Sequence, residues 1–226
     1  MNKMRYVYTA MLLMVFILAS GSSFANQSYG GRTYEVTITN LTRGQIFSPP
    51  IVISHKRNFS LFSLGDPAIA PLYKLAEDGL TAPLVAHISE LPSVFDYEVA
   101  EGPILPGDSV TLEVSTRRHF RYISVAGMLV TTNDAFFAVR DLRVPGWGRA
   151  TVEAIVYDAG SEANSEDCAD IPGPPCGNGE VRNTTGAEGY VHVHAGIHGI
   201  GNLEQVNPAM HDWRNPAALI TVRPIY

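Results

Sequence analysis

Apolar and polar residues alternate along segment 33–39, which places Tyr34, Val36 and Ile38 on one face. This period of two residues predicts a β-strand with one buried face. Short segments of the same kind follow, separated by Pro-Gly, Gly-Asp and Asn-Asp turns. They predict further strands over 95–99, 110–115, 122–130, 136–142, 150–157, 190–194 and 219–223. The pattern therefore predicts an all-β fold, an antiparallel β-sandwich.

Two segments between the first strand and the others have apolar residues at helical spacing. Asp66 and Pro67 suit the start of a helix, because Asp caps free N–H groups and Pro fits the first turn. The spacing continues over 68–79 and stops at Gly79. A second short helix is expected over 84–91. The sandwich should therefore carry one or two short helices in its connections.

Two irregular segments complete the pattern. Pro49 and Pro50 favour extended chain at the edge of a sheet, because proline cannot donate to a ladder. Segment 161–185 is polar, acidic and rich in Gly and Pro, which predicts a long loop. It contains Cys168 and Cys176, the two cysteines of the chain. In an exported protein this pair predicts a local disulfide, and the spacing is a poor zinc motif.

The N-terminus has the build of a secretory signal peptide: a basic start, an apolar run over 6–19 and small residues ahead of a cleavage site. We expect cleavage after Ala25, so that 1–25 is removed and 26–226 forms a single domain. The apolar run is short for a membrane span, which needs about 20 residues. No second long apolar run follows, so the mature protein should not span a membrane. These features predict a secreted or periplasmic protein.

The net charge of the chain limits the classes of partner that the protein is expected to bind. The chain has 16 basic and 22 acidic side chains, a formal net charge of −6. Removal of the signal peptide would take away two basic residues and make the charge more negative. An acidic surface repels nucleic acid and anionic membranes. It is compatible with hard cations such as calcium.

Acidic side chains gather where the strands reverse. The Asn133–Asp134 turn and the loop that begins at Asp158 should lie at the same end of the sheet, with Glu162 close by. Calcium removes the repulsion between such carboxylates and takes about six to eight oxygen ligands. Asn133 and loop carbonyls could complete the shell, with spare oxygens from Glu166, Asp167 and Asp170. The alternative is that these residues only bend and cap the backbone.

Three histidines lie within GYVHVHAGIHGIG: His192, His194 and His198. The first two share one face of a predicted strand, and zinc accepts three histidines plus water. A zinc or copper site there, in a metalloprotein or metalloenzyme, is therefore the competing hypothesis. Histidine also serves as a hydrogen-bonding residue where a strand ends in a glycine loop. No G-x-S-x-G, H-E-x-x-H or P-loop motif accompanies the cluster.

Several stretches together resemble one known family. NDAFFAV followed by W-x-x-A-x-V-E-A-I-V-Y-D-A-G-S-E is similar to the spondin domain, the N-terminal module of the F-spondin family. The stretches NLTRGQIFSPPIVISH, LFSLGDPAIAPLYKLAEDG and HAGIHGIG…DWRNPAALITV fit the same family, and most resemble its stand-alone bacterial members. The resemblance covers about 34–222.

This resemblance implies a C2-like antiparallel β-sandwich that binds one calcium ion through loop carboxylates. By position these are Asp134, Asp158 and Glu162, although the family more often has Asp at the last position. The family belongs to extracellular matrix proteins and their partners. The resemblance therefore implies an interaction or adhesion module without catalysis, whose partner is an extracellular or cell-envelope protein or glycan.

Overall fold

The alternating segment at the start of the pattern forms strand β1 (Gly31–Asn40) in the computed structural model, which describes residues 31–226. The predicted signal peptide over 1–25 lies outside the described residues. Tyr34, Val36 and Ile38 are buried, as their alternation predicts. The other elements, in chain order, are β2 (Ile51–His55), α1 (Ala70–Asp78), α2 (Ala82–Ser89), β3 (Val94–Val99), β4 (Ser109–Arg117), β5 (Tyr122–Met128), β6 (Ala135–Arg143), β7 (Ala150–Asp158), η1 (Cys168–Asp170), β8 (His192–Val193), η2 (Gly201–Val206), α3 (Pro208–His211) and β9 (Ala218–Pro224).

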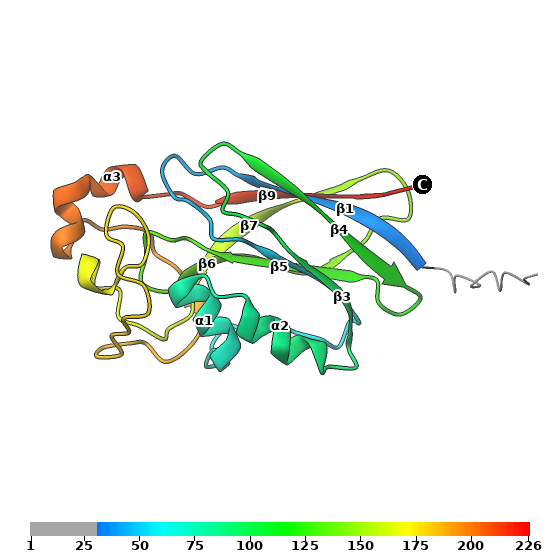
Figure 1. Ribbon diagram of the computed structural model, residues 1–226, viewed down its shortest axis with the longest axis horizontal. Helices are drawn as coiled ribbons and strands as arrows, with labels where there is room; N and C mark the ends of the chain where they lie inside the picture. Colours follow the sequence, from blue (N-terminus) through cyan, green and yellow to red (C-terminus); the bar gives the residue numbers. More distant parts are fainter. Residues whose placement is uncertain (1–30) are drawn as a thin grey trace, which may run out of the picture.

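The protein is mostly β, with one antiparallel sheet of nine strands that is nearly closed into a barrel. Its order is β3-β2-β5-β6-β7-β9-β1-β4, and β8 pairs with β7 off this path. β7 joins the two halves, because residues 150–154 pair with β9 and 155–158 pair with β6. The terminal strands β3 and β4 lie beside each other, and the Ser115 backbone N–H donates to Asp96 across them at 2.7 Å. Figure 1 shows the two halves facing each other.

Two apolar cores flank the central strands. One fills the space between the two halves and includes Val36, Val125, Phe137 and Ile220. The second lies between the outer face of β2, β5 and β6 and the helices α1 and α2, which Figure 1 shows against this half of the sheet. Because β2, β5 and β6 are covered on both faces, most of their residues are buried and their sequences lack strict alternation.

Both predicted helices are present, but the predicted start of the first is wrong. α1 begins at Ala70 instead of at Asp66, and it ends before Gly79 as predicted. Asp66 is held elsewhere, since its carbonyl oxygen accepts from the N–H of Val191 at 2.8 Å. Gly79 takes a left-handed conformation as the residue that follows the helix, which glycine adopts without strain.

The sequence predicts only extended chain at a sheet edge around the paired prolines, so it misses the strand that follows them, and the edge position is wrong. β2 lies between β3 and β5 and is completely buried. Pro49 and Pro50 precede the strand, so they remove no hydrogen bond from its ladder. The carbonyl of Pro50 still accepts from the N–H of Ala100 at 2.9 Å.

The remaining strand predictions agree with the structure to within a few residues, except that β8 is shorter than predicted. Segment 161–185 is a long loop with only the short helix η1 in it. Within residues 31–226, none of the helices has the length and apolar composition that crossing a membrane requires.

Candidate functional site

Asp134 and Asp158 lie side by side at one end of the sheet, as the strand reversals predict. Asp158 is the last residue of β7 and pairs with Ala135, the first residue of β6. The N–H of Ala159 donates to the carbonyl oxygen of Asp134 at 3.1 Å. Both aspartates have 0% of their surface exposed. Two carboxyl groups are therefore buried on neighbouring strands, where an uncompensated charge is costly.

Asp134 is held by the loop that follows β7. Its Oδ2 accepts from the N–H of Ser161 at 2.7 Å, from the Ser161 hydroxyl at 3.2 Å and from the N–H of Glu162 at 3.0 Å. Its Oδ1 is buried and has no hydrogen-bond partner among the described residues. Burial, together with the nearby carboxylate of Asp158, raises the pKa of Asp134 well above its ordinary value. A bound cation would oppose this shift.

Asp158 has partners for both of its oxygens. Oδ1 accepts from the N–H of Gly160 at 2.6 Å, and Oδ2 accepts from the side-chain amide of Asn164 at 2.5 Å. Burial raises the pKa of Asp158, while these two hydrogen bonds oppose the shift. The tight turn at Gly160 has a positive φ of 64°, and a Cβ there would lie 2.2 Å from the carbonyl oxygen of Tyr190. Only glycine at this position allows the backbone of Tyr190 to lie so close to the turn.

Glu162, the third predicted calcium ligand, directs its carboxyl group to other neighbours. It is buried, and its Oε1 accepts from the N–H of Asn183 at 2.6 Å. Burial raises the pKa of Glu162 to about 8, and the charges of Glu77, Asp170 and Asp78 add to the shift. The backbone N–H of Glu162 therefore contacts Asp134. Its carboxyl group instead contacts the backbone of Asn183 and lies close to other acidic residues, Glu77, Asp170 and Asp78.

His192 faces Asp158 together with a residue that the sequence analysis missed, Glu188. One potential ligand atom from each of the three lies within 4.8 Å of the other two. Nε2 of His192 is 3.5 Å from Oδ1 of Asp158 and 3.9 Å from Oε2 of Glu188. This nitrogen is buried and has no hydrogen-bond partner among the described residues. The only sequence signal for Glu188 is its position four residues before His192.

The other ring nitrogen of His192 is anchored to the backbone. Nδ1 lies 3.1 Å from the carbonyl oxygen of Val193. A carbonyl oxygen only accepts, so Nδ1 donates and Nε2 is left to face the two carboxylates. A backbone carbonyl on the far side of an imidazole is the arrangement that orients metal-ligating histidines.

His194 has a structural role, because both of its nitrogens are engaged. Nδ1 accepts from the N–H of Gly196 at 3.0 Å, and Nε2 lies 3.0 Å from Oδ1 of Asn164. Burial lowers the pKa of His194 to about 3, with His192 and His198 adding to the shift. The neutral ring therefore orients Asn164, which in turn donates to Asp158.

His198 is exposed and lies outside the group formed by Asp158, Glu188 and His192. Its backbone N–H donates to the carboxylate of Glu166 at 2.5 Å, and the N–H groups of Gly199 and Ile200 donate to the same carboxylate at 2.8 and 2.9 Å. Glu166, expected as a spare calcium ligand, instead satisfies three consecutive backbone donors. The three histidines therefore occupy three different environments.

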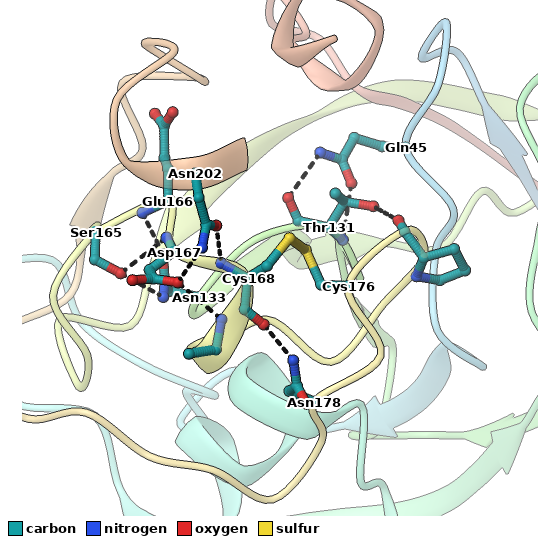
Figure 2. Close-up of a disulfide and its surroundings, with 12 residues drawn as sticks. Gln45, Thr131, Asn133, Ser165, Glu166, Asp167, Cys168, Cys176, Asn178 and Asn202 are labelled. Carbon is teal, nitrogen blue, oxygen red and sulfur yellow. Dashed lines mark hydrogen bonds between the residues drawn. A yellow bond between two sulfur atoms is a disulfide. The ribbon is translucent and has the colours of Figure 1, made fainter. Parts of the chain in front are cut away.

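The predicted disulfide joins Cys168 to Cys176. Figure 2 shows the polar contacts around it. Asn202 accepts from the N–H of Cys168 at 2.6 Å and donates to Asp167 at 2.8 Å, while Asn178 donates to the Cys168 carbonyl at 2.6 Å. The disulfide loop is thereby connected to η2 and to the turn that carries Asp134, since the N–H of Glu166 donates to Asn133 at 3.3 Å.

A comparison with models of known protein families found no match for this chain, and a search of curated proteins found none either. The fold and the site define the class by themselves. The chain is a mostly-β protein with one disulfide and a candidate metal-binding group of Asp, Glu and His side chains at one end of its sheet.

Proposed function

We propose that the protein is an exported calcium-binding interaction or adhesion module without catalysis, similar to the spondin domain. The observation that carries the proposal is the buried pair Asp134 and Asp158, in which Oδ1 of Asp134 has no partner among the described residues. A divalent cation would compensate both carboxylate charges and be coordinated by Oδ1 of Asp134. Calcium suits this position because it prefers carboxylate and carbonyl oxygens.

The side chains at this end of the sheet include the oxygen ligands that calcium requires. Asp134 and Asp158 provide carboxylate oxygens on adjacent strands, and Glu188 adds a third carboxylate close to Asp158. Glu162 departs from what the resemblance implies, because its carboxyl group contacts the backbone of Asn183. We therefore assign Glu162 a smaller part in calcium binding.

The finer description of the fold, a C2-like β-sandwich, is part of the same proposal. Two halves of the sheet that share β7 and enclose one apolar core support it. The loops at the end that bears Asp134 and Asp158 are irregular, and a cation would order them into a surface for an extracellular or cell-envelope protein or glycan. The disulfide is compatible with an exported protein.

A second candidate function is a transition-metal protein, with zinc or copper held by Asp158, Glu188 and His192. The specific observation in its favour is the orientation of His192, with Nδ1 on the Val193 carbonyl and Nε2 free toward two carboxylates. It differs from the predicted site of three histidines, because His194 has both nitrogens engaged and His198 is exposed.

Calorimetric titration of the metal-free protein with calcium and with zinc distinguishes the two. The proposal expects calcium binding that is lost in Asp134→Asn and Asp158→Asn and retained in His192→Gln. Zinc binding that is lost in His192→Gln and Glu188→Gln, without calcium binding, would favour the second candidate. Glu153→Gln is the matched control, because Glu153 is an exposed carboxylate on the same strand as Asp158. If neither metal binds, both functions are wrong.

A further inference from the structure

The opposite end of the sheet carries a depression lined by arginines. Five of the chain's 16 basic side chains, Arg32, Arg117, Arg118, Arg121 and Arg143, surround a cavity of about 740 Å³ together with Trp147. They come from the start of β1, the end of β4 with the β4–β5 connection, and the end of β6 with its following turn. In Figure 1 this end lies beside the C-terminus, away from α3. The other end of the sheet, which bears Asp134 and Asp158, is called the metal end. We call it the arginine depression.

The arginine depression is positively charged although the chain as a whole is acidic. No Asp or Glu lines it. Among residues 31–226, none of the five arginines forms an ion pair with a carboxylate, whereas Arg182 and Arg223 do. Guanidinium groups stay charged at all physiological pH values, so five like charges converge without compensation. Such convergence favours a negatively charged ligand.

Several of its side chains are held in place before any ligand binds. The guanidinium of Arg117 stacks over the rings of Phe95, at 4.6 Å, and Phe120, at 5.6 Å. Arg32 donates to the carbonyl of Gly146, in the turn that carries Trp147. The hydroxyl of Tyr34 donates to the carbonyl of Pro145 in the same turn at 3.0 Å. Preorganised groups lose less entropy when a ligand binds.

Trp147 indicates what kind of anion fits. Trp147 is 84% exposed and lies in the turn to which Arg32 donates. Indole presents a flat apolar face that can cover the apolar face of a sugar ring, while a guanidinium forms paired hydrogen bonds with a carboxylate or a sulfate. We propose that the arginine depression binds acidic oligosaccharides, with the anionic groups on the arginines and a sugar ring on Trp147.

Two other polyanions fit less well. An extended nucleic acid would also contact the rest of a protein whose net charge is −6, which disfavours it. An anionic membrane requires a flat or convex contact with several apolar side chains, whereas Trp147 is the one large exposed apolar side chain among the residues that line this concave site. A concave site of about 740 Å³ suits a short chain of sugars better than an extended polymer or a flat membrane.

The inference extends the proposed interaction function by naming a class of partner, and it uses none of the residues at the metal end. The two can therefore fail separately. Binding to acidic oligosaccharides that is equal in EDTA and in calcium, and unchanged in Asp158→Asn, would support the arginine depression whatever the outcome of the metal titrations.

The test is calorimetric binding of the exported protein to three hexasaccharides: sulfated (heparin-derived), carboxylated (oligogalacturonate) and neutral (chitohexaose). We expect binding to at least one of the two acidic ligands and not to the neutral one. The sulfated and carboxylated arms distinguish which anionic group is recognised. The double variant Arg118→Gln with Arg143→Gln should weaken binding about tenfold or more, because two charge-assisted contacts are lost. Trp147→Ala should weaken it as well.

Arg214→Gln is the matched control, since it removes one charge from an exposed arginine at the metal end. All of these variants alter exposed side chains, so the fold should be preserved and melting temperatures should match. The proposal is overturned if neither acidic hexasaccharide binds, if the double variant binds as well as the control, or if single-stranded DNA or anionic vesicles bind more tightly through the same arginines.

Discussion

Asp134 and Asp158 are buried next to each other because the residue after Asp134 pairs with Asp158 across β6 and β7. Burial and the charge of Asp158 raise the pKa of Asp134, and one oxygen of Asp134 lacks a hydrogen-bond partner among the described residues. Without a cation this arrangement costs stability, since a buried charge needs compensation. A bound cation would supply that compensation.

Calcium should raise the melting temperature of the protein, and Asp158→Asn should abolish most of the increase. At a calcium concentration a hundredfold above Kd, binding adds about 2.7 kcal/mol to the free energy of unfolding. For a domain of this size that corresponds to an increase of about 5 to 10 °C. Asp134→Asn should behave like Asp158→Asn, and Glu162→Gln should reduce the increase less. Thermal unfolding in EDTA and in calcium measures the effect, and an unchanged increase in both Asp variants would exclude the site.

His192 and His194 should respond differently to substitution. His192→Gln should leave calcium affinity nearly unchanged, because imidazole is a poor ligand for a hard cation. His194→Ala should destabilise the fold by about 1 to 3 kcal/mol, since it leaves the buried Gly196 N–H and the Asn164 side chain without partners. Urea unfolding gives the second quantity and calcium titration the first. Equal destabilisation by the two variants would contradict the structural role assigned to His194.

Stability in EDTA should include a component that decreases as the pH falls through 6.5, and His55 should contribute to it. His55 is completely buried between the Lys56 carbonyl and the Ser124 hydroxyl, each at 2.8 Å. Burial lowers its pKa from the ordinary value of 6.5. Below pH 6.5 the unfolded chain therefore takes up a proton that the folded protein does not, and the free energy of unfolding decreases.

The measurement for His55 is the free energy of unfolding between pH 8 and pH 5, compared between the wild type and His55→Gln. The variant should show a smaller slope below pH 6.5, whatever its absolute stability. The exposed His119→Gln serves as the control and should keep the wild-type slope. Identical slopes in all three proteins would mean that His55 takes up its proton equally in the folded and unfolded states.

Glu166 should hold the segment that follows the histidine cluster. Glu166→Ala removes the acceptor of the three backbone N–H groups of residues 198–200. We expect faster amide hydrogen exchange at these positions and a loss of about 1 to 3 kcal/mol in stability, because three partly buried N–H donors lose a charged partner. Glu153→Ala, at an exposed carboxylate, should change neither. Unaltered exchange at 198–200 in Glu166→Ala would be inconsistent with the hydrogen bonds described.

The disulfide should stabilise the protein to a moderate degree. Replacement of both Cys168 and Cys176 by Ala should lower the free energy of unfolding by about 2 to 3 kcal/mol, because the loop that it closes is short. Denaturant unfolding of the variant, compared with the oxidised wild type, gives the value. Peptide mapping without reduction should show the linked fragment in exported material, and free thiols there would contradict the pairing.

Local patterns in the chain are sufficient for the strands other than β2 and for the meeting of Asp134 with Asp158. Alternation identifies β1, and turn residues mark the reversals between β5, β6 and β7. Once the reversals are known, two residues on adjacent antiparallel strands must meet at the same end of the sheet. The local disulfide likewise follows from the spacing of two cysteines. All of these depend on residues that are near in sequence or on adjacent strands of one meander.

The tertiary structure decided the contacts between segments that are distant in sequence. Packing of α1 and α2 on β2 makes that strand central and buried, although the prolines before it favour an edge. Loop 161–185 turns the carboxyl group of Glu162 toward Asn183, and the segment after it brings Glu188 and His192 to Asp158. Three separated segments form the arginine depression. Periodicity reports which face of an element is buried, but not which distant loop covers it or where a loop side chain points, because those depend on how the whole chain packs.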